Sequence, residues 1–225
     1  MISNKPINRP RSSHSMNNSW ITRSFKIGRI VYLESDLEYS NFLTVEMDPQ
    51  IVKFCEHPLE ISYEVDGRIE KSIFDMEVEY RDGKNELWEI KYKCELTDME
   101  DKSSIRSQHQ IMKQRQWCEG NKIDYRVRTD EEIYQGRNYI NNLSYMHHLL
   151  LRIDEPKIFS LSKDLLKIIK PIDSICIEHL SDEKNTKAIV MQSVVYMFYK
   201  GWISMNIYDK ELNYSTEVSY ATKKI

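Results

Sequence analysis

Asp75, Glu89 and Lys91 have the residue types and spacing of a site that hydrolyses phosphodiesters with the help of a metal ion. An acid in one strand-like segment is followed by a turn and then by Glu-x-Lys in the next segment. Glu89 and Lys91 are two residues apart, so in a strand they share a face, toward which Asp75 is also expected to point. Carboxylate oxygens suit Mg²⁺, a bound metal lowers the pKa of its water, and a lysine stabilises developing phosphorane charge. These residues therefore predict a metal-assisted hydrolytic site.

A further acid, Glu38, lies upstream in the stretch "YLESDLE". Ser35 followed three residues later by Glu38 is a capping box, in which the serine caps the first helical turn and the glutamate bonds back to it. A helix over residues 35–47 also places Glu38 on one face with Phe42 and Val45, which points its carboxylate into the fold. The residues alone leave both roles open, helix cap and inward acid.

The elements that must position these acids begin with a β-hairpin. Residues 73–80, "IFDMEVEY", alternate between apolar and acidic side chains, and "ELWEIKYK" alternates again after the turn in "RDGKN". A turn centred on that glycine sets residues whose numbers sum to about 166 opposite one another, so Asp75 faces Lys91 and Glu77 faces Glu89. Like charges directly across a ladder are unfavourable unless a cation or solvent separates them. The alternative is an exposed charged face of the sheet.

The remaining patterns divide the chain into two folded parts. A polar helix over about 98–118, a strand "KIDYRVRT" and a short helix "TDEEI" complete an α/β domain. Three helices are then expected over 138–152, 161–169 and 187–200, followed by the strand-like pieces "WISMNIY" and "STEVSY". This order is typical of a winged helix-turn-helix, although any small helical domain with a terminal hairpin has the same pattern. We expect a basic arm over 1–23, an α/β domain over 24–150 and a mostly α-helical, winged-helix-like domain over 151–225.

The composition indicates one or two globular domains. The 225 residues are 40% apolar and 30% charged, and no apolar run approaches the roughly 20 residues that a membrane helix needs. The first 33 residues carry a net charge of +6, so against a total of −3 the rest carries −9. A polar arm this basic suits nucleic-acid phosphates, although a solvated tail has the same composition. We expect a cytoplasmic protein without a membrane segment.

The other metal-binding residue types show no ligand spacing. The four cysteines are scattered without a C-x-x-C pair, which is typical of reduced thiols in the cytosol. His57, His109 and the His147-His148 pair are not spaced as ligands of one metal, and we interpret each as a surface or structural histidine. Glycine-rich phosphate loops are absent, so the chain itself is not expected to hydrolyse ATP.

The pattern Asp75…Glu89-Ile90-Lys91 resembles the PD-(D/E)xK nuclease core. The upstream stretch "YLESDLEYSNFLTVEMDPQIVKFCEHPL" is similar to the amino-terminal nuclease domain of the TnsA family. TnsA proteins are the endonuclease subunits of heteromeric cut-and-paste transposases and cut the 5′ ends of the element. With "YRVRTDEEI" included, the resemblance covers about residues 24–135, and the carboxy-terminal half is similar in kind to the family's winged-helix domain.

The resemblance implies a restriction-endonuclease-like (PD-(D/E)xK) α/β endonuclease domain over 24–150 and a winged-helix domain over 151–225. The family usually has Pro or Thr, Asp and Phe around the strand acid, where this chain reads "IFDM", so Asp75 and Glu77 stay alternatives and the nuclease pattern favours Asp75. The implied catalytic residues are Glu38, Asp75, Glu89 and Lys91. The implied ligands of Mg²⁺, for which Mn²⁺ can substitute, are Glu38, Asp75, Glu89 and the peptide carbonyl of Ile90.

On this resemblance the helix cap is assigned to Ser35 alone, which frees Glu38 for the metal, and Asp48 is a candidate ligand of a second metal. The chain is then expected to be a bacterial cytoplasmic endonuclease acting on double-stranded DNA at transposon ends. Its expected partners are a TnsB-like transposase, which cuts the 3′ ends, and a TnsC-like AAA+ ATPase. Two other readings stay open: a free-standing restriction or repair nuclease of the same fold, and a winged-helix DNA-binding or assembly protein whose α/β half is catalytically idle.

Overall fold

The computed structural model describes residues 5–7, 18–65, 67–97 and 101–221. The chain divides into two compact units, one of residues up to Val45 with Gln50–Ile133 and the other of Glu46–Pro49 with the residues from Tyr134 onward. Most of the basic arm predicted for residues 1–23 lies outside the described residues. Within the described part of the chain, we find no helix long and apolar enough to cross a membrane.

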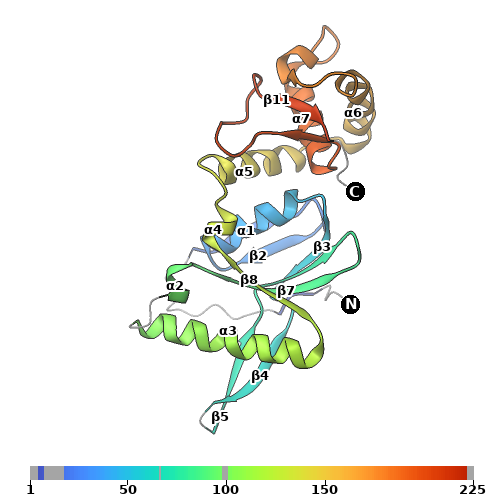
Figure 1. Cartoon of the computed structure of the whole chain (residues 1–225). Coiled ribbons are helices and arrows are strands. Elements are labelled where there is room, and N and C mark those ends of the chain that lie inside the picture. Colours follow the sequence, from blue (N-terminus) through green and yellow to red (C-terminus); the bar gives the residue numbers. More distant parts are fainter. Residues whose placement is uncertain (1–4, 8–17, 66, 98–100, 222–225) are drawn as a thin grey trace. The chain divides into compact units, whose positions relative to one another are not determined.

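The first unit is built around a mixed four-stranded sheet with the strand order β3-β6-β7-β8 (Figure 1). Its strands are antiparallel except for β7 and β8, which are parallel and joined through helix α3, because a parallel pair needs a long crossover. The elements are β1 (Trp20–Arg23), β2 (Ile30–Leu33), α1 (Asp36–Met47), β3 (Ile51–Glu56), β4 (Glu60–Val65), β5 (Arg68–Ile73), β6 (Met76–Tyr80), β7 (Asn85–Lys91), α2 (Cys94–Thr97), α3 (Lys102–Asn121), β8 (Asp124–Thr129) and α4 (Asp130–Ile133).

Helices α1 and α3 cover opposite faces of this sheet (Figure 1). On the α1 side, the rings of Phe42 and Phe54 meet edge to face with centroids 5.8 Å apart. On the α3 side, Leu87 and Cys118 belong to one buried apolar cluster. Both helices were predicted, and α3 ends at Asn121 with Lys122 in the left-handed conformation as its cap. The order of elements therefore confirms the α/β expectation for this unit.

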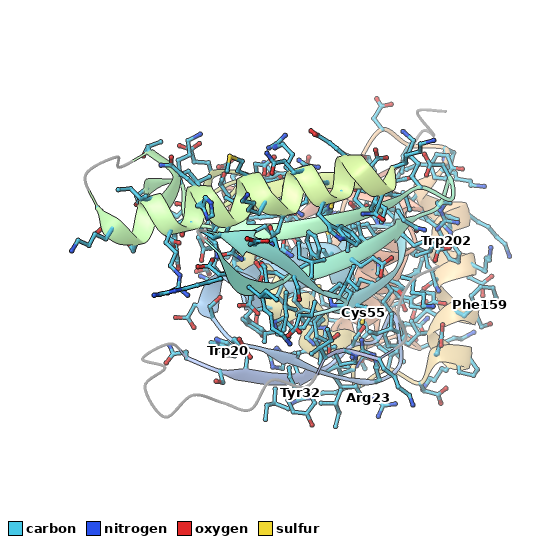
Figure 2. The ribbon with its side chains drawn as sticks, turned by 90° about the horizontal axis from the view of Figure 1, so that it is seen from below. Trp20, Arg23, Tyr32, Cys55, Phe159 and Trp202 are labelled. Carbon is cyan, nitrogen blue, oxygen red and sulfur yellow. The ribbon has the colours of Figure 1, made fainter. Side chains whose placement is uncertain are left out.

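The β1–β2 ribbon holds the beginning of α1. The indole of Trp20 donates a 2.7 Å hydrogen bond to Oδ1 of Asp36 and stacks on Tyr39 with ring centroids 4.1 Å apart. Figure 2 shows Trp20, Arg23 and Tyr32 along this ribbon. Since Asp36 is the first residue of α1, the ribbon fixes the end of the helix that carries Glu38.

The turn of the β6–β7 hairpin lies at a different position from the predicted one. The amide of Tyr80 donates to the carbonyl of Lys84 at 2.8 Å, and Gly83 takes a φ of +86°, which glycine adopts without a steric cost. The turn is therefore centred one residue earlier than predicted, and every cross-strand partner shifts by two residues.

This shift changes which acids face one another. Glu77 lies opposite Leu87 in the observed register, so the predicted pairing of Glu77 with Glu89 is wrong. The predicted pairing of Asp75 with Lys91 is also wrong, because the same register places Asp75 level with Glu89.

The segment predicted as one strand over 73–80 is divided between two sheets. Ile73 ends β5, which pairs only with β4 in a separate two-stranded sheet, and Met76 begins β6 in the main sheet. Asp75 lies in the short link between them, where the chain passes from one sheet to the other. The direction of its side chain is therefore determined by the junction between two strands and not by the alternation of side chains along one strand.

The second unit contains helices and a small three-stranded sheet of order β10-β11-β9. Its elements are α5 (Tyr139–Leu150), α6 (Glu155–Ile169), β9 (Ile175–Cys176), the 3-10 helix η1 (Ile177–Leu180), α7 (Lys187–Tyr199), β10 (Ile203–Met205) and β11 (Glu217–Tyr220). The three predicted helices and the two predicted strands are present.

Helix α5 groups with the second unit, although the expected boundary after residue 150 places it in the first. The side chain of Asn142 donates to the carbonyls of Ile207 and Lys210, both at 2.8 Å, and accepts from the amide of Leu212 at 2.9 Å. These bonds join α5 to the connection between β10 and β11, a long-range contact that no local pattern reveals.

Candidate metal and catalytic site

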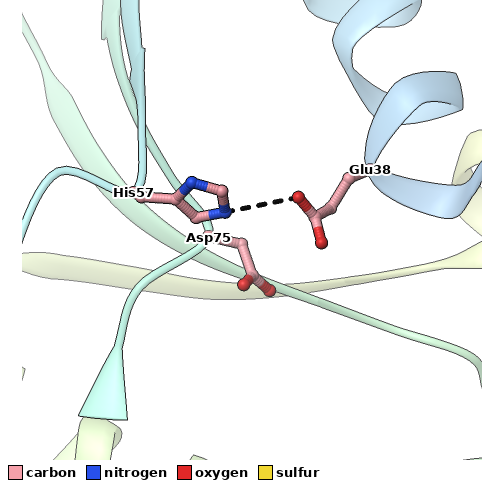
Figure 3. A group of neighbouring side chains, drawn as sticks. All are labelled: Glu38, His57 and Asp75. Atoms are coloured by element: carbon pink, nitrogen blue, oxygen red, sulfur yellow. Dashed lines mark ion pairs between the residues drawn. The ribbon is translucent and has the colours of Figure 1, made fainter. Parts of the chain in front are cut away.

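Glu38 lies in the first turn of α1 and has both of the roles considered for it. Its Oε2 accepts a 3.0 Å hydrogen bond from the amide of Glu34 and its Oε1 a 3.2 Å bond from the hydroxyl of Ser35. The same carboxylate faces inward, with Oε2 3.3 Å from Nε2 of His57 (Figure 3). The prediction that Ser35 caps the helix alone is therefore wrong, since one carboxylate has enough lone pairs for the cap and for an inward partner.

Burial and hydrogen bonding shift the pKa of Glu38 in opposite directions. Burial raises the pKa of its carboxyl, but the contact with His57 and the amide of Glu34 outweigh this effect and leave the pKa lowered. The helix N-terminus also favours an anion at this position. Glu38 is thus an ionised acid directed into the fold.

Asp75 is held by hydrogen bonds on three sides. Its amide donates to the carbonyl of Trp88 at 3.0 Å, its carbonyl accepts from the amide of His57 at 3.0 Å, and its Oδ2 accepts from the amide of Ile90 at 2.7 Å. Burial and the nearby charge of Glu89 raise the pKa of Asp75 well above its ordinary value. A cation beside this carboxyl is the kind of neighbour that favours its ionised form.

Glu89 and Lys91 form an ion pair on β7 in which the carboxylate is buried and the lysine side chain is half-buried. Oε1 of Glu89 lies 2.9 Å from Nζ of Lys91, and the Glu89 side chain is 1% exposed. The reading of this sheet face as an exposed charged surface is therefore wrong. Burial lowers the pKa of Lys91, but the charges of Glu89 and Asp75 outweigh it, so that the pKa is raised and Lys91 is an ammonium ion at neutral pH.

Helix α3 contributes two amides that hold Glu89. Nε2 of Gln110 donates to Oε1 of Glu89 and Nε2 of Gln114 donates to Oε2, each at 2.8 Å. Gln114 in turn accepts a 2.7 Å bond from the hydroxyl of Tyr125. This network fixes Glu89 and, through it, the ammonium group of Lys91. Sequence reasoning missed both glutamines, because a polar helix gives no sign of which of its amides face a distant strand.

His57 is the other site residue that sequence reasoning missed. It is 4% exposed and follows β3 directly, and its imidazole lies beside Glu38 and Asp75 (Figure 3). One ligand atom from each of these three residues lies within 4.8 Å of the other two. His57 was interpreted as a surface or structural histidine; it is buried, and the two acids beside it are distant in sequence. The only available signal was its place in "CEHPL", inside the stretch that carries the family resemblance.

Not every predicted site residue joins this group. Asp75, and not Glu77, lies with Glu38 and His57, which separates the two alternatives for the strand acid by position. Glu89 is adjacent, but its oxygens are engaged by the two glutamines and by Lys91. Asp48 belongs to the short segment that groups with the second unit.

The donor set fits a divalent cation. Metal–ligand distances of about 2.0 to 2.6 Å mean that ligand atoms around one ion lie within roughly 5 Å of one another. The carboxylates of Glu38 and Asp75 and the imidazole of His57 meet this condition. Two carboxylates and an imidazole are ordinary ligands for such an ion, and Lys91 adds a positive charge from the neighbouring strand β7.

Comparison with known proteins agrees with this geometry. Residues 48–130 match the sequence model of the family described as the TnsA-like endonuclease N-terminal domain, while the chain matches no curated protein. The matched segment includes Asp75, Glu89 and Lys91, and Glu38 precedes it. The mixed sheet flanked by helices is the restriction-endonuclease-like α/β fold that this family implies, and such nuclease domains usually use a divalent metal. The match over residues 48–130 therefore supports a TnsA-type endonuclease domain in this chain.

Proposed function

We propose that this chain is the A subunit of a heteromeric transposase, a Mg²⁺-dependent endonuclease that cuts the 5′ ends of a transposon. The observation that carries the proposal is that Glu38 and Lys91 both lie close enough to Asp75 to affect its charge, in a chain whose residues 48–130 match the TnsA-like family. Three separate elements, α1, the β5–β6 link and β7, contribute these residues. An idle scaffold has no need to concentrate buried charge in this way, since each buried charge costs free energy.

The ligands in this proposal are Glu38 and Asp75. The family resemblance also implies Glu89 and the carbonyl of Ile90, but the oxygens of Glu89 are bonded by Gln110, Gln114 and Lys91, so we assign Glu89 to the positioning of Lys91. When bound, Mg²⁺ or Mn²⁺ lowers the pKa of its water and neutralises charge on the scissile phosphate. Asp75 is aimed by its bond from the Ile90 amide, so that its second oxygen is available to a ligand.

Lys91 acts in this scheme as a fixed cation. Its raised pKa keeps it protonated at the pH of the cell, so it does not serve as a general base. The carboxylate of Glu89 holds the ammonium group in place, and the charge is then available to stabilise the additional negative charge of the transition state. Glu89, fixed by Gln110 and Gln114, is the positioning residue for Lys91.

The second unit is proposed as a winged-helix domain. The chain order α6, β9, η1, α7, β10, β11 and the sheet order β10-β11-β9 support this assignment. Helix α7, "KAIVMQSVVYMFY", has Lys187 as its sole charged residue, whereas helices that read bases in the major groove carry several polar and basic side chains. We therefore propose that this domain serves mainly in assembly with partner proteins and in contacts to the DNA backbone.

The proposed partners are transposon-end DNA, a TnsB-like transposase and a TnsC-like AAA+ ATPase. The basic arm supports a role in phosphate contacts, because residues 1–23 contain four basic side chains and no acidic one. The protein is proposed to act in the bacterial cytoplasm.

The proposal is tested with a supercoiled plasmid that carries the ends of the element. The full chain is incubated with Mg²⁺, alone and together with a TnsB-like transposase that acts on these ends, and the 5′ ends of the cut strands are mapped. Cleavage at the element's 5′ ends that requires both proteins supports the proposal. The variants Asp75→Asn and Lys91→Ala are expected to abolish this cleavage.

Other outcomes separate the alternatives. Robust cleavage by the chain alone, without the transposase, identifies a free-standing nuclease. Cleavage that is unchanged in both variants shows that the described site is idle. A gene neighbourhood without a transposase and an AAA+ ATPase contradicts the transposition proposal even if the nuclease is active.

A further inference from the structure

His57 is placed at the metal site by its backbone as well as by its side chain. Its amide donates to the carbonyl of Asp75 at 3.0 Å, and its carbonyl accepts from the amide of Ile7 at 2.8 Å. It is one of two described non-glycine residues with positive φ, at +43°. A left-handed conformation costs a non-glycine residue on the order of 1 kcal/mol or more and is often found at functional sites. The main chain therefore directs this imidazole toward Glu38 and away from the path of an ordinary strand end.

Nε2 is the ring nitrogen of His57 that faces Glu38, and an atom of this kind serves either as a hydrogen-bond donor or as a metal ligand. The His57 side chain is 5% exposed, and Nε2 has no hydrogen-bond partner among the described residues. Nε2 lies 3.3 Å from Oε2 of Glu38, and this contact does not meet hydrogen-bond geometry. Buried polar atoms in folded proteins almost always have a hydrogen-bond partner or a bound ion, so Nε2 is expected to have a partner that is not a protein group.

The acid that the family resemblance offers as a third ligand is already committed. Glu89 receives hydrogen bonds from Gln110 and Gln114 and the ion pair from Lys91. The ligand atoms that gather within 4.8 Å of one another come instead from Glu38, His57 and Asp75. A cation bound between Glu38, His57 and Asp75 therefore has an imidazole as its third protein ligand. In a site built only from oxygen ligands, a carboxylate would take that place.

We propose that His57 is a direct ligand of the divalent cation, through Nε2, beside Glu38 and Asp75, and that it biases the site toward Mn²⁺ over Mg²⁺. Imidazole is a better ligand for Mn²⁺ and the later divalent metals than for Mg²⁺, which prefers oxygen and retains its water. The inference rests on the proposed function, because it concerns the same metal site, but it assigns a ligand and a metal preference that the nuclease pattern does not contain.

The test uses Mn²⁺ bound to the full chain and pulsed electron paramagnetic resonance. Electron spin-echo modulation detects a nitrogen bonded directly to Mn²⁺, and protein labelled with ¹⁵N-histidine identifies that nitrogen as imidazole. The wild-type protein is expected to show one coordinated histidine nitrogen. This first measurement needs no substitution, so a folding defect cannot obscure it.

Two substitutions assign the signal to His57. Asn and Asp tolerate positive φ better than most residues, so His57→Asn and His57→Asp suit the observed backbone. Both are expected to lose the nitrogen coupling. His57→Asn is expected to weaken Mn²⁺ binding by about tenfold or more, as loss of even a supporting partner does. His57→Asp restores a ligand and is expected to bind metal with its preference moved toward Mg²⁺, measured by competition in calorimetry.

A matched control is His148→Gln, since His148 is exposed and bonds only to the carbonyl of Ser144 among its described hydrogen bonds. It is expected to keep both the coupling and the wild-type affinities. Bound Mn²⁺ without a coordinated nitrogen, or a coupling that persists in His57→Asn, overturns the inference and leaves the proposed nuclease intact. No Mn²⁺ or Mg²⁺ binding at millimolar concentration contradicts both the inference and the metal dependence of the proposed function.

Discussion

The amide of Ile90 donates a 2.7 Å hydrogen bond to Oδ2 of Asp75, so the strand β7 that carries Glu89 and Lys91 also orients the acid before β6. One backbone group thus couples both parts of the candidate site. The cross-strand register makes this bond possible, because it sets Asp75 beside Trp88 and Ile90 and not opposite Lys91.

Asp75→Asn is expected to abolish cleavage without destabilising the protein. The asparagine oxygen can still accept from Ile90, while the loss of charge removes repulsion from Glu89, which together with burial raises the pKa of Asp75. An acid with a raised folded-state pKa costs stability at neutral pH, so the variant is expected to melt at the same temperature or higher. Thermal denaturation and the nicking assay measure the two effects.

The matched control for this change is Glu77→Gln, which removes an acid from the same segment outside the group of Glu38, His57 and Asp75. We expect it to cleave at the wild-type rate. Loss of cleavage in Glu77→Gln with retention in Asp75→Asn would show that the strand acid has been assigned to the wrong residue.

Glu38→Gln is expected to abolish cleavage with only a small loss of stability. The glutamine oxygen can keep one of the two capping bonds, from Glu34 or from Ser35, but it lacks the charge that faces His57 and the proposed metal. Ser35→Ala tests the cap by itself and is expected to cost about 1 kcal/mol of stability while cleavage continues. Cleavage by Glu38→Gln at the wild-type rate would reduce Glu38 to its capping role.

Lys91→Ala is expected to abolish cleavage and also to destabilise the protein. It leaves the buried carboxylate of Glu89 without its counter-charge, a change that costs roughly 3 kcal/mol in comparable buried pairs. The double variant Lys91→Ala/Glu89→Gln is expected to recover part of that stability and none of the activity. A double-mutant cycle by urea unfolding measures the coupling. If the two stability changes were simply additive, the Glu89–Lys91 pair would not be an energetic unit.

The stability of the protein is expected to depend on pH through the protonation of His147 in the second unit. Burial, with a smaller effect from His148, lowers the pKa of the fully buried His147 to about 4. The unfolded chain then binds more protons than the folded one between the ordinary histidine pKa of about 6.5 and about 4, so stability falls as the pH drops through this window. The shift corresponds to about 3 kcal/mol at most.

Urea unfolding at intervals from pH 7.5 to 4 measures this slope. His147→Leu is expected to flatten it, because a leucine has no proton to gain, whereas His148→Gln, at an exposed neighbour, is expected to retain most of it. An equally steep slope in His147→Leu would place the titrating group elsewhere.

Local patterns were sufficient to predict most elements of this protein. The capping box before α1, the Asp-Gly turn between β6 and β7, and the alternation around Glu89 and Lys91 are each contained within a few neighbouring residues. Such patterns depend on backbone geometry and on the period of side-chain burial, which the sequence expresses directly. The types of the site residues, two acids and a Glu-x-Lys pair, also follow from these segments.

Tertiary structure alone decided how these residues meet. At the turn between β6 and β7, the amide of Tyr80 donates to the carbonyl of Lys84 and the amide of Gly83 donates to the carbonyl of Tyr80. A sequence pattern leaves the register of such a hairpin uncertain by a residue or two. The passage of the chain from one sheet to another at Asp75 depends on which strands pair at long range.

Long-range contacts also decide which residues surround the charged groups of the candidate site. His57 approaches Glu38 and Asp75, and Gln110 and Gln114 reach Glu89, from elements far apart in the chain. The local elements and the chemical groups available in each of them follow from short stretches of sequence. Only the folded chain determined which charges became neighbours, because burial and electrostatic coupling act through space and not along the sequence.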